Sequence, residues 1–541
     1  MAADHGGSGV GRTSFAASAA TLLSTVIGFA RNLALASAIG TGLVADSYNI
    51  ANQVPSQIFA LLGGGTIAFV FVPQLMRHAR TSESRGDEYG SFILFAGAAF
   101  GILVTALLLA LSPQLIQWMG GSSWGHEQSS LGLRLTLWCI PQVFFYAVYS
   151  VASQLMYARG RFTAVAWMPT LNSLAIILAC VPIVWVGTVE ANSPNSLSNW
   201  EVIVLGGTTL LGSAIQSIFL VVLLYRAGFR LRPRFRLRGL GLRATALAGL
   251  LTVVAIACYQ GANLVAAALS TQAGTVAKGL GFEGRGYTAF FYAQTLSFVA
   301  AAVASASLAN ILLQRLSGHY ADGDEETASK ELNEAILATG ALLIPVMCLS
   351  ICLGPLGTDL LFARGETSHS AAQYIGVVLA VLSIGLVPHA LHEILIRPFY
   401  AVHDAITPLR SAGVVGGVWI LGCVAARVFL PPQHALLGIA GAVSLSYIVD
   451  VPLRLRSLNK KLKFKLSGRV LRGYATALGA GLGATVVIGA ATMYLERSIP
   501  DHWLARTVLL LGGIAGFLAI YHPLTARGPA SLRLLVQWLR T

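Results

Sequence analysis

The feature that most constrains the fold is a series of apolar runs, each about 20 residues long, separated by short polar connections. A run of that length forms an α-helix that crosses the hydrocarbon core of a bilayer. Only 11% of the residues are charged, whereas soluble proteins have about 25%. The sequence therefore predicts an all-α, polytopic membrane protein with about 14 transmembrane helices. The predicted spans are residues 15–40, 47–75, 91–119, 129–157, 163–187, 201–226, 242–268, 287–314, 332–362, 371–400, 408–430, 434–453, 470–494 and 504–523.

The positions of Lys and Arg indicate which connections face the cytoplasm. Two connections after even-numbered spans contain the basic runs FRLRPRFRLR (229–238) and RLRSLNKKLKFKLSGRVLR (454–472). Because Lys and Arg accumulate in cytoplasmic loops, both termini are expected in the cytoplasm. This topology accounts for the formal net charge of +14. No nucleic-acid partner is expected, since the basic segments lack interleaved aromatic residues. Binding of anionic lipid headgroups is the alternative role of the basic runs.

Short motifs recur at a spacing of about 240 residues, which indicates an internal duplication. YARGRF (157–162) is echoed by YAVHDA (400–405), and LSPQL (111–115) by LGPLG (353–357). A duplicated unit of six helices gives both halves the same orientation and predicts a substrate site between them. The predicted segments are a cytoplasmic tail (1–14), a six-helix half (15–226), a basic linker (227–241), a second six-helix half (242–453), a basic loop (454–469), and two extra helices with a C-terminal tail (470–541).

The motifs that enzymes need are missing from the sequence. It contains no GxxxxGK[ST] nucleotide-binding loop, no zinc-type cluster and no catalytic nucleophile motif. The six cysteines lie in apolar segments, and none has CxxC spacing. Such cysteines are typical of small buried side chains. The sequence therefore predicts a transporter rather than an enzyme, with no cofactor and no metal.

Arg31 lies deep in the first apolar run and is the leading candidate for a binding residue. A charge in the bilayer interior costs roughly 2.5–3.5 kcal/mol or more, so it usually faces a partner or a water-filled cavity. On a helix, Ser24 falls on roughly the same face two turns earlier. One interpretation is an anion anchor, and the alternative is a structural ion pair with Asp46 or Glu393.

Three amides follow on the second span. Asn49, Asn52 and Gln53 have the i, i+3, i+4 spacing that places side chains on one helical face. Such amides can hydrogen-bond phosphate groups or sugar hydroxyls of a substrate. They can equally tie two membrane helices together.

An acidic residue, Glu393, lies in the tenth span with His389 and His392 nearby. A Glu–His group within a membrane can relay protons or bind a coupling ion. Arg397 follows Glu393 at i+4, which permits an ordinary helical ion pair, and we favour this interpretation.

Several of these segments resemble a known family. LSTVIGFARNLALASAIG (23–40), ADSYNIANQVP (45–55) and AFVFVPQL (68–75) are similar to the opening of the MurJ/MviN flippases, which belong to the multidrug/oligosaccharidyl-lipid/polysaccharide exporter superfamily. YARGRFTAVAWMPTLNS (157–173) and FYAVHDAITP (399–408) resemble two further signatures of that family. The helix count also fits the family, whose last two helices add a lipid-facing groove.

The resemblance implies export of a polyprenyl-pyrophosphate-linked glycan, lipid II, from the inner to the outer leaflet by alternating access. Family members hold the pyrophosphate with cavity arginines, and Arg31 matches one of them. Thr25, Asn32, Gln294 and Thr295 stand where family members commonly carry charged residues. The predicted substrate-binding residues are Ser24, Thr25, Arg31, Asn32, Asn49, Asn52, Gln53, Gln294 and Thr295, with Asp46, Glu393 and Arg397 as gate or coupling residues.

The resemblance also implies a multi-pass protein of a bacterial plasma membrane that acts in peptidoglycan and cell-wall biogenesis. Its expected partners are lipid II, the bilayer, and proteins of cell-wall synthesis or division. One alternative is an exporter of another polyprenyl-linked glycan or of a drug. The other is a transport-inactive scaffold that recruits cell-wall enzymes through its basic loops.

Overall fold

The computed structural model describes residues 7–63, 83–232, 242–402, 404–498, 502–526 and 528–529. Within these ranges the chain forms helices and connections and contains no β-strand, which confirms the predicted all-α fold. Parts of four predicted segments lie outside the described residues. They belong to the N-terminal tail (1–6), the second span (64–75), the basic linker (233–241) and the C-terminal tail (530–541).

The chain divides into two compact units, residues 1–272 and 273–541. The helices of unit 1 are α1 (Gly7–Ile39), α2 (Leu43–Gly63), α4 (Glu83–Ala110), α5 (Ser112–Gly120), η1 (Gly121–Ser123), α6 (His126–Cys139), α7 (Gln142–Ala158), α8 (Phe162–Val186), η2 (Pro194–Ser196), α9 (Asn199–Arg226) and α10 (Leu242–Gly279), whose end belongs to unit 2. Unit 2 contains α11 (Tyr287–Ala321), α12 (Glu325–Phe362), α13 (His369–Ile384), α14 (Leu386–Leu395), α15 (Arg397–Ala401), α16 (Ile406–Phe429), α17 (Pro432–Leu462), α18 (Gly468–Glu496) and α19 (Trp503–Thr525).

The division between the units falls inside α10, not in the predicted linker at 227–241. Side chains of α10 contact other helices of unit 1. Asn263 accepts a hydrogen bond from Gln53, and Gln272 donates to the carbonyl of Met119. These contacts attach most of the seventh predicted span to unit 1, and the duplicated six-helix halves at 15–226 and 242–453 stay a prediction.

The helix lengths agree with the predicted spans. Among the described residues, 11 helices are long and apolar enough to cross a membrane, or 12 with the bent pair His369–Ile384 and Leu386–Ala401. Each of these coincides with a predicted span. The described part of the predicted span 47–75 falls on α2, and the predicted span 287–314 falls on α11.

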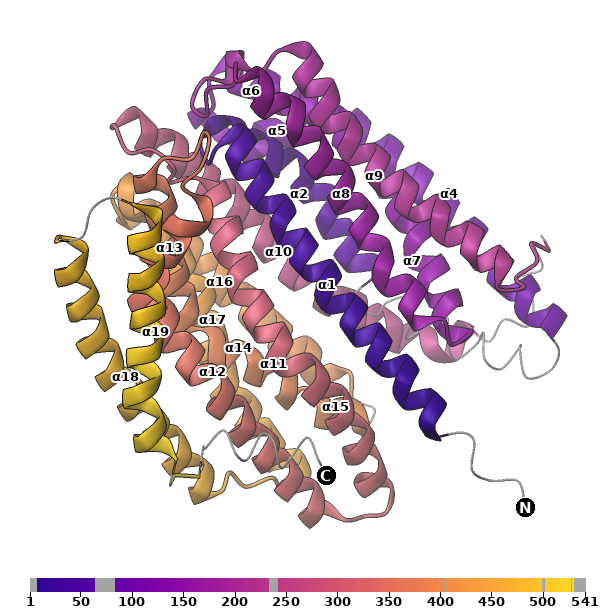
Figure 1. The fold of residues 1–541 in the computed structure, drawn as a ribbon. Coiled ribbons are helices and arrows are strands. Elements are labelled where there is room, and N and C mark those ends of the chain that lie inside the picture. Colours follow the sequence, from indigo (N-terminus) through magenta and orange to yellow (C-terminus); the bar gives the residue numbers. More distant parts are fainter. Residues whose placement is uncertain are drawn as a thin grey trace. The chain divides into compact units, whose positions relative to one another are not determined.

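Unit 1 is built from neighbouring helices that pack through apolar faces. Helix α1 lies beside α8 (Figure 1), and α2 contacts α6 and α7. Leu35, Ile39, Leu131 and Ile176 belong to one buried cluster between these helices. In a bilayer the gain comes mainly from close van der Waals packing, because lipid tails are as apolar as these side chains.

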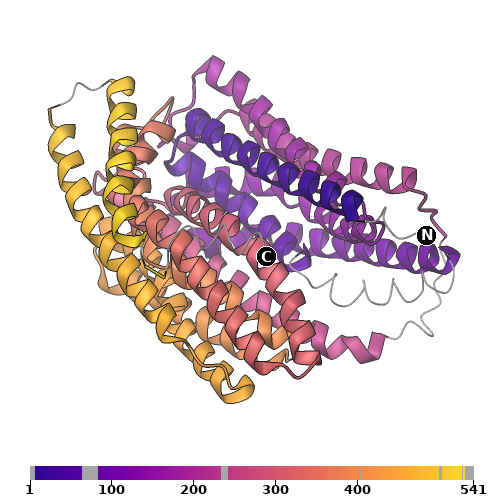
Figure 2. The ribbon, with the colours of Figure 1, turned by 60° about the horizontal axis from the view of Figure 1, so that its bottom comes forward.

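Unit 2 is organised around α12, which contacts α11, α13, α14, α18 and α19. Helices α18 and α19 lie side by side in both ribbon views (Figures 1 and 2). A glycine allows α18 to approach α12 closely, since a Cβ on Gly340 would lie only 2.5 Å from Cζ of Tyr474. Tyr474 also donates a hydrogen bond to the carbonyl of Ile336. The final helices are therefore attached to unit 2 by specific contacts.

The span that contains α13 and α14 is broken by a 43° bend. The break lies at Gly385, where a Cβ would come within 2.6 Å of Cα of Ser444. Ser444 Oγ is 2.9 Å from the carbonyl oxygen of Val381 and donates to it. A polar side chain thus satisfies a carbonyl next to the break, as the apolar membrane interior requires.

The two signature segments of the internal repeat each form an ion pair at a helix end. In unit 1, Arg159 Nη2 lies 2.6 Å from Oδ1 of Asp87. In unit 2, Asp404 Oδ2 lies 2.6 Å from Nζ of Lys461, and Asp404 Oδ1 accepts a hydrogen bond from the Thr407 N–H. Partial burial opposes ionisation of Asp404, but the hydrogen bonds from Lys461 and Thr407 prevail and lower its pKa to about 2.

Candidate functional site

A cavity of about 790 Å³ lies within unit 1 and contains Arg31. Helix α1 supplies one wall, and α7 and α8 supply the others. The residues of α1 that line it are Thr21, Ser24, Thr25, Gly28 and Arg31. Three of the residues predicted to bind substrate, namely Ser24, Thr25 and Arg31, therefore share one cavity. The spacing of seven residues between Ser24 and Arg31 predicted that these two share a face, whereas Thr25 was a candidate from the family resemblance alone.

Arg31 supplies a positive charge to this cavity. Its Nη2 and Nε atoms lie 3.2 and 3.4 Å from Oδ1 of Asn32. In the part of the chain that the structure describes, no carboxylate lies within ion-pair distance of Arg31. The two predicted structural partners make other contacts, since Asp46 accepts from Thr271 and Glu393 pairs with Arg397. An uncompensated guanidinium beside a cavity favours an anionic ligand, because an unpaired charge is costly away from bulk water.

Hydroxyl groups and aromatic rings complete the cavity wall. Ser173 and Tyr149 line it together with Tyr157 and Phe162, whose rings stack with centroids 5.6 Å apart. The sequence analysis did not identify these four residues as site residues. Tyr157 and Phe162 belong to the repeated YARGRF motif, which was the available signal. The wall thus combines hydroxyl groups, several of which donate to backbone carbonyls in this structure, with an apolar surface next to Arg31.

The predicted amides of α2 do not line this cavity. Asn52 Oδ1 accepts a hydrogen bond from Gln142 Nε2 at 3.1 Å, and Gln53 Nε2 lies 3.4 Å from Oδ1 of Asn263. Asn49 is buried. Asn52 and Gln53 connect α2 to α7 and α10, which is the helix-tying role that the sequence left open. Their contribution to substrate binding stays a prediction.

The remaining predicted residues lie in unit 2. Gln294 is buried, and its Nε2 has no hydrogen-bond partner among the described residues. Thr295 donates to the carbonyl of its own helix at Phe291. Glu393 Oε2 lies 3.4 Å from Nη2 of Arg397, the i+4 pair that we favoured. A substrate-binding role for Gln294 and Thr295 and a coupling role for Glu393 and Arg397 stay predictions.

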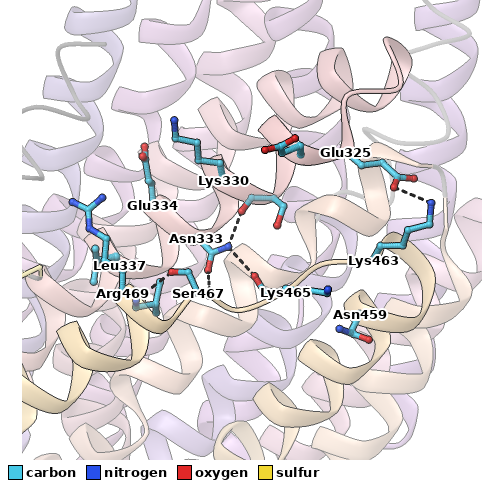
Figure 3. Close-up of a pocket in the computed structure, with 13 residues that line it drawn as sticks. Glu325, Lys330, Asn333, Glu334, Leu337, Asn459, Lys463, Lys465, Ser467 and Arg469 are labelled. Carbon is cyan, nitrogen blue, oxygen red and sulfur yellow. Dashed lines mark hydrogen bonds and ion pairs between the residues drawn. The ribbon is translucent and has the colours of Figure 1, made fainter.

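A second, larger cavity of about 920 Å³ lies at one end of unit 2, among α12, the end of α17 and the start of α18. Figure 3 shows that Glu325 points toward Lys463, and their charged atoms are 3.1 Å apart. Asn333 bridges the wall, because it donates to the carbonyl of Lys465 and accepts from the Ser467 N–H. Acids and bases line this cavity together, so its charges largely neutralise one another. The smaller Arg31 cavity is the better site for an anion.

The sequence predicted no metal site. Over the described ranges, no group of three or more His, Cys, Asp or Glu side chains is arranged to hold a metal ion.

The long apolar helices and a cation-bearing cavity define a multi-pass membrane transporter fold. The matching solved structures have the same fold. One, titled lipid II flippase MurJ in an inward closed conformation, aligns with a TM-score of 0.74 at 18% identity, over 93% of this chain and 97% of that chain. An inward-facing multidrug resistance MATE family transporter of the MOP superfamily aligns with a TM-score of 0.66 at 14% identity, over 82% of this chain and 96% of that chain.

Sequence comparison identifies the family. The profile of the family described as lipid II flippase MurJ matches residues 35–512, so the chain belongs to that family. The lipid II flippase MurJ of Burkholderia cenocepacia is 28% identical over 480 residues, which cover 85% of this chain and 86% of that protein. The probable lipid II flippase MurJ of Vibrio cholerae is 24% identical over 527 residues, covering 93% and 94% of the two chains.

Proposed function

We propose that this protein is a lipid II flippase, which moves the lipid-linked peptidoglycan precursor from the inner to the outer leaflet of a bacterial membrane by alternating access. Membership of the family supports the substrate. The observation that carries the proposal for the site is Arg31, a cation without a carboxylate partner among the described residues, at the wall of a cavity. We place both termini in the cytoplasm, on the positive-inside distribution of Lys and Arg.

In this proposal Arg31 binds the pyrophosphate of lipid II. A guanidinium offers several N–H donors in a fixed plane, which matches the oxygens of a phosphate group. Ser24 and Thr25 lie on the same cavity wall and supply hydroxyl groups, and that of Thr25 would leave the carbonyl of Thr21 to donate to the substrate. The stacked rings of Tyr157 and Phe162 provide a flat apolar face for sugar rings or the start of the lipid. Because Arg31 is the one cation among the described lining residues, beside several hydroxyls, the site holds its anion largely through neutral hydrogen bonds.

Complementation tests the substrate and the anion anchor together. The lipid II flippase of a bacterial host is depleted, and this chain or its Arg31→Ala variant is expressed. Lipid II in the outer leaflet is then measured with an externally added enzyme that cleaves it. We expect the wild-type chain to restore exposure of lipid II and Arg31→Ala to restore less than about a tenth of it, a loss of at least ~1.4 kcal/mol.

The other outcomes are equally informative. Equal rescue by both proteins would mean that Arg31 is structural. No rescue by either protein, despite normal amounts in the membrane, would contradict lipid II as the substrate. Two other functions would then have to be tested. One is export of another lipid-linked glycan or of a drug, and the other is a scaffold that recruits cell-wall or division proteins.

A further inference from the structure

Unit 2 contains a buried ionic cluster that the proposed substrate site does not use. Asp450 and Arg454 come from α17 and His392 from α14, and their side chains are 0%, 1% and 4% exposed. Ser411 of α16 donates a hydrogen bond to Asp450. Ionisable side chains buried inside membrane-spanning helices are rare and usually mark a proton or ion pathway.

The hydrogen bonds in this cluster determine the protonation state of His392. Its Nδ1 lies 2.7 Å from Oδ2 of Asp450, and its Nε2 lies 3.4 Å from Nη2 of Arg454. A guanidinium can only donate, and a carboxylate can only accept. Nε2 must therefore accept from Arg454 while Nδ1–H donates to Asp450. The imidazole is neutral and is held in a single tautomer.

Among the charged groups that the structure describes near His392, the charges cancel when His392 is neutral. The carboxylate of Asp450 and the guanidinium of Arg454 form one pair, and Glu393 and Arg397 form another on the adjacent turn. A proton added to Nε2 gives the cluster a net charge of +1. It also places an N–H against the donors of Arg454. In a low-dielectric interior this repulsion is strong, so the arrangement selects against the protonated imidazole.

The remaining groups around His392 show where Arg454 can move. Arg454 Nη1 has no hydrogen-bond partner among the described residues, although the side chain is buried. Glu393 and Tyr400 lie within electrostatic range of this guanidinium. The Tyr447 ring of α17 packs against both His392 and His389. Glu393 and Tyr400 therefore offer acceptors to Arg454 if a proton displaces it from Nε2.

We propose that His392 is a proton-binding site whose occupancy is linked to the transport cycle of this protein. Its ligand is a single proton that binds at Nε2 and leaves from it. The proton disfavours the arrangement described above and favours one in which Arg454 has left His392. By linkage, a state that binds the proton better is populated more as the pH falls. The inference rests on the proposed flippase function for its transport readout and on geometry for the site itself.

The first experiment compares purified wild-type protein with His392→Gln in lipid vesicles that contain lipid II. The glutamine amide can still donate to Asp450 and accept from Arg454, but it does not titrate. Exposure of lipid II is measured with the same pH on both sides, from pH 6 to 8, and with pH gradients of either sign. We expect the wild-type rate to change at least fivefold across these conditions and the His392→Gln rate to change less than twofold.

His389→Gln is the matched control, since His389 lies on the same helix but stacks on Phe298 and Tyr447 without an ion-pair partner among the described residues. We expect this variant to keep the wild-type pH response. A wild-type rate that is independent of pH, or a full pH response in His392→Gln, would overturn the proton site.

The second experiment does not require transport. Thermal unfolding of the detergent-solubilised proteins is measured between pH 8 and pH 5. We expect the wild-type melting temperature to fall with pH more steeply than that of His392→Gln, because protonation of His392 opposes the described arrangement. Parallel curves would contradict the inference. If wild-type protein moves no lipid II, the proposed function fails and this comparison still decides the proton site. If His392→Gln does not fold, histidine NMR of the wild-type protein reports whether the buried imidazole holds one neutral tautomer at pH 8 and gains a proton by pH 5.

Discussion

Arg31 and Arg454 are the same residue type and both lie in helices long and apolar enough to cross a membrane, although Arg454 comes one residue after the predicted span 434–453, yet their surroundings differ. Arg454 is 2% exposed and lies between Asp450 and His392, so its charge is neutralised within unit 2. Arg31 is half-buried, donates hydrogen bonds to the amide oxygen of Asn32, has no carboxylate within ion-pair distance among the described residues and lines a cavity. A charged side chain that is paired within the protein holds helices together, whereas one without a partner of opposite charge is available to bind a ligand.

The sequence partly indicates this difference between Arg31 and Arg454. Asp450 precedes Arg454 by four residues, which places the two side chains on one helical face. The corresponding position before Arg31 is Ile27, which cannot neutralise it. In membrane helices, the residue four positions before an arginine thus helps to distinguish a structural cation from a binding one. Four measurements test this comparison.

The largest expected effect is on the stability of unit 2. Replacement Arg454→Met removes one partner of a buried ion pair and leaves the carboxylate of Asp450 without its cation. Such changes cost about 3–5 kcal/mol. We expect the detergent-solubilised variant to unfold at much lower temperature than wild type, or to be absent from the membrane. Arg31→Met, with no ion pair to break among the described residues, is the control and is expected to cost less than about 1 kcal/mol. Equal destabilisation by both changes would refute the comparison.

The next effect is on transport. Arg31→Lys keeps the charge but loses the planar set of donors, so we expect lipid II exposure to fall between threefold and tenfold, or by about 0.7–1.4 kcal/mol. Arg134 serves as the control residue, because its guanidinium also contacts an asparagine, Asn199 at 2.7 Å, but does not line the cavity. Arg134→Lys is expected to leave exposure within twofold of wild type. A similar loss in both variants would argue against a special role for the Arg31 cavity.

A smaller effect concerns the helix end fixed by Asp404. Asp404→Asn weakens the hydrogen bonds that Asp404 accepts from the first-turn N–H groups of Ile406 and Thr407 and the contact with Lys461, and loss of comparable capping hydrogen bonds costs about 1 kcal/mol. Because the folded-state pKa of Asp404 is lowered to about 2, below the ordinary value near 4, its stabilising contribution is present above about pH 4 and is lost as the pH falls toward 2. We expect the melting temperatures of wild type and variant to differ at pH 6 and to converge as the pH falls from 4 toward 2. A constant difference would show that the charge of Asp404 is not involved.

The smallest effect is expected at the pair of Glu393 and Arg397. The Glu393 side chain is 42% exposed, and the pair has i+4 spacing on the helix surface. Exposed pairs of this kind contribute about 0.3–0.5 kcal/mol. Glu393→Gln should therefore shift the melting temperature by no more than about a degree or two. A shift as large as that of Arg454→Met would place Glu393 among the buried partners of the ionic cluster.

Hydropathy predicted the fold well, because membrane-spanning helices are determined by the length and composition of each segment alone. Arg31 and Ser24 could be grouped because they share one face of a single helix, and Thr25 was added by the family resemblance. The sequence could not show that Asn52 bonds to Gln142, since helical periodicity gives a side chain's direction and not its neighbour. For the same reason His392 and Asp450, 58 residues apart, could not be paired. Tyr157 and Phe162 belong to the repeated YARGRF motif, but the motif does not show which helices they face, so only the structure places them at the cavity.

Because the span is broken at Gly385, helix α14 can tilt about this residue as a separate segment. His392 lies seven residues beyond this pivot, which at the rise of an α-helix is about 10 Å. A tilt of about 10° around the pivot would therefore carry the imidazole through nearly 2 Å, enough to break its 2.7 Å hydrogen bond to Asp450. Helix α13, on the other side of the break, would not have to move. An unbroken helix would have to tilt along its whole length to move the imidazole this far. With the bend, a small rotation of α14 alone makes or breaks the hydrogen bond between His392 and Asp450.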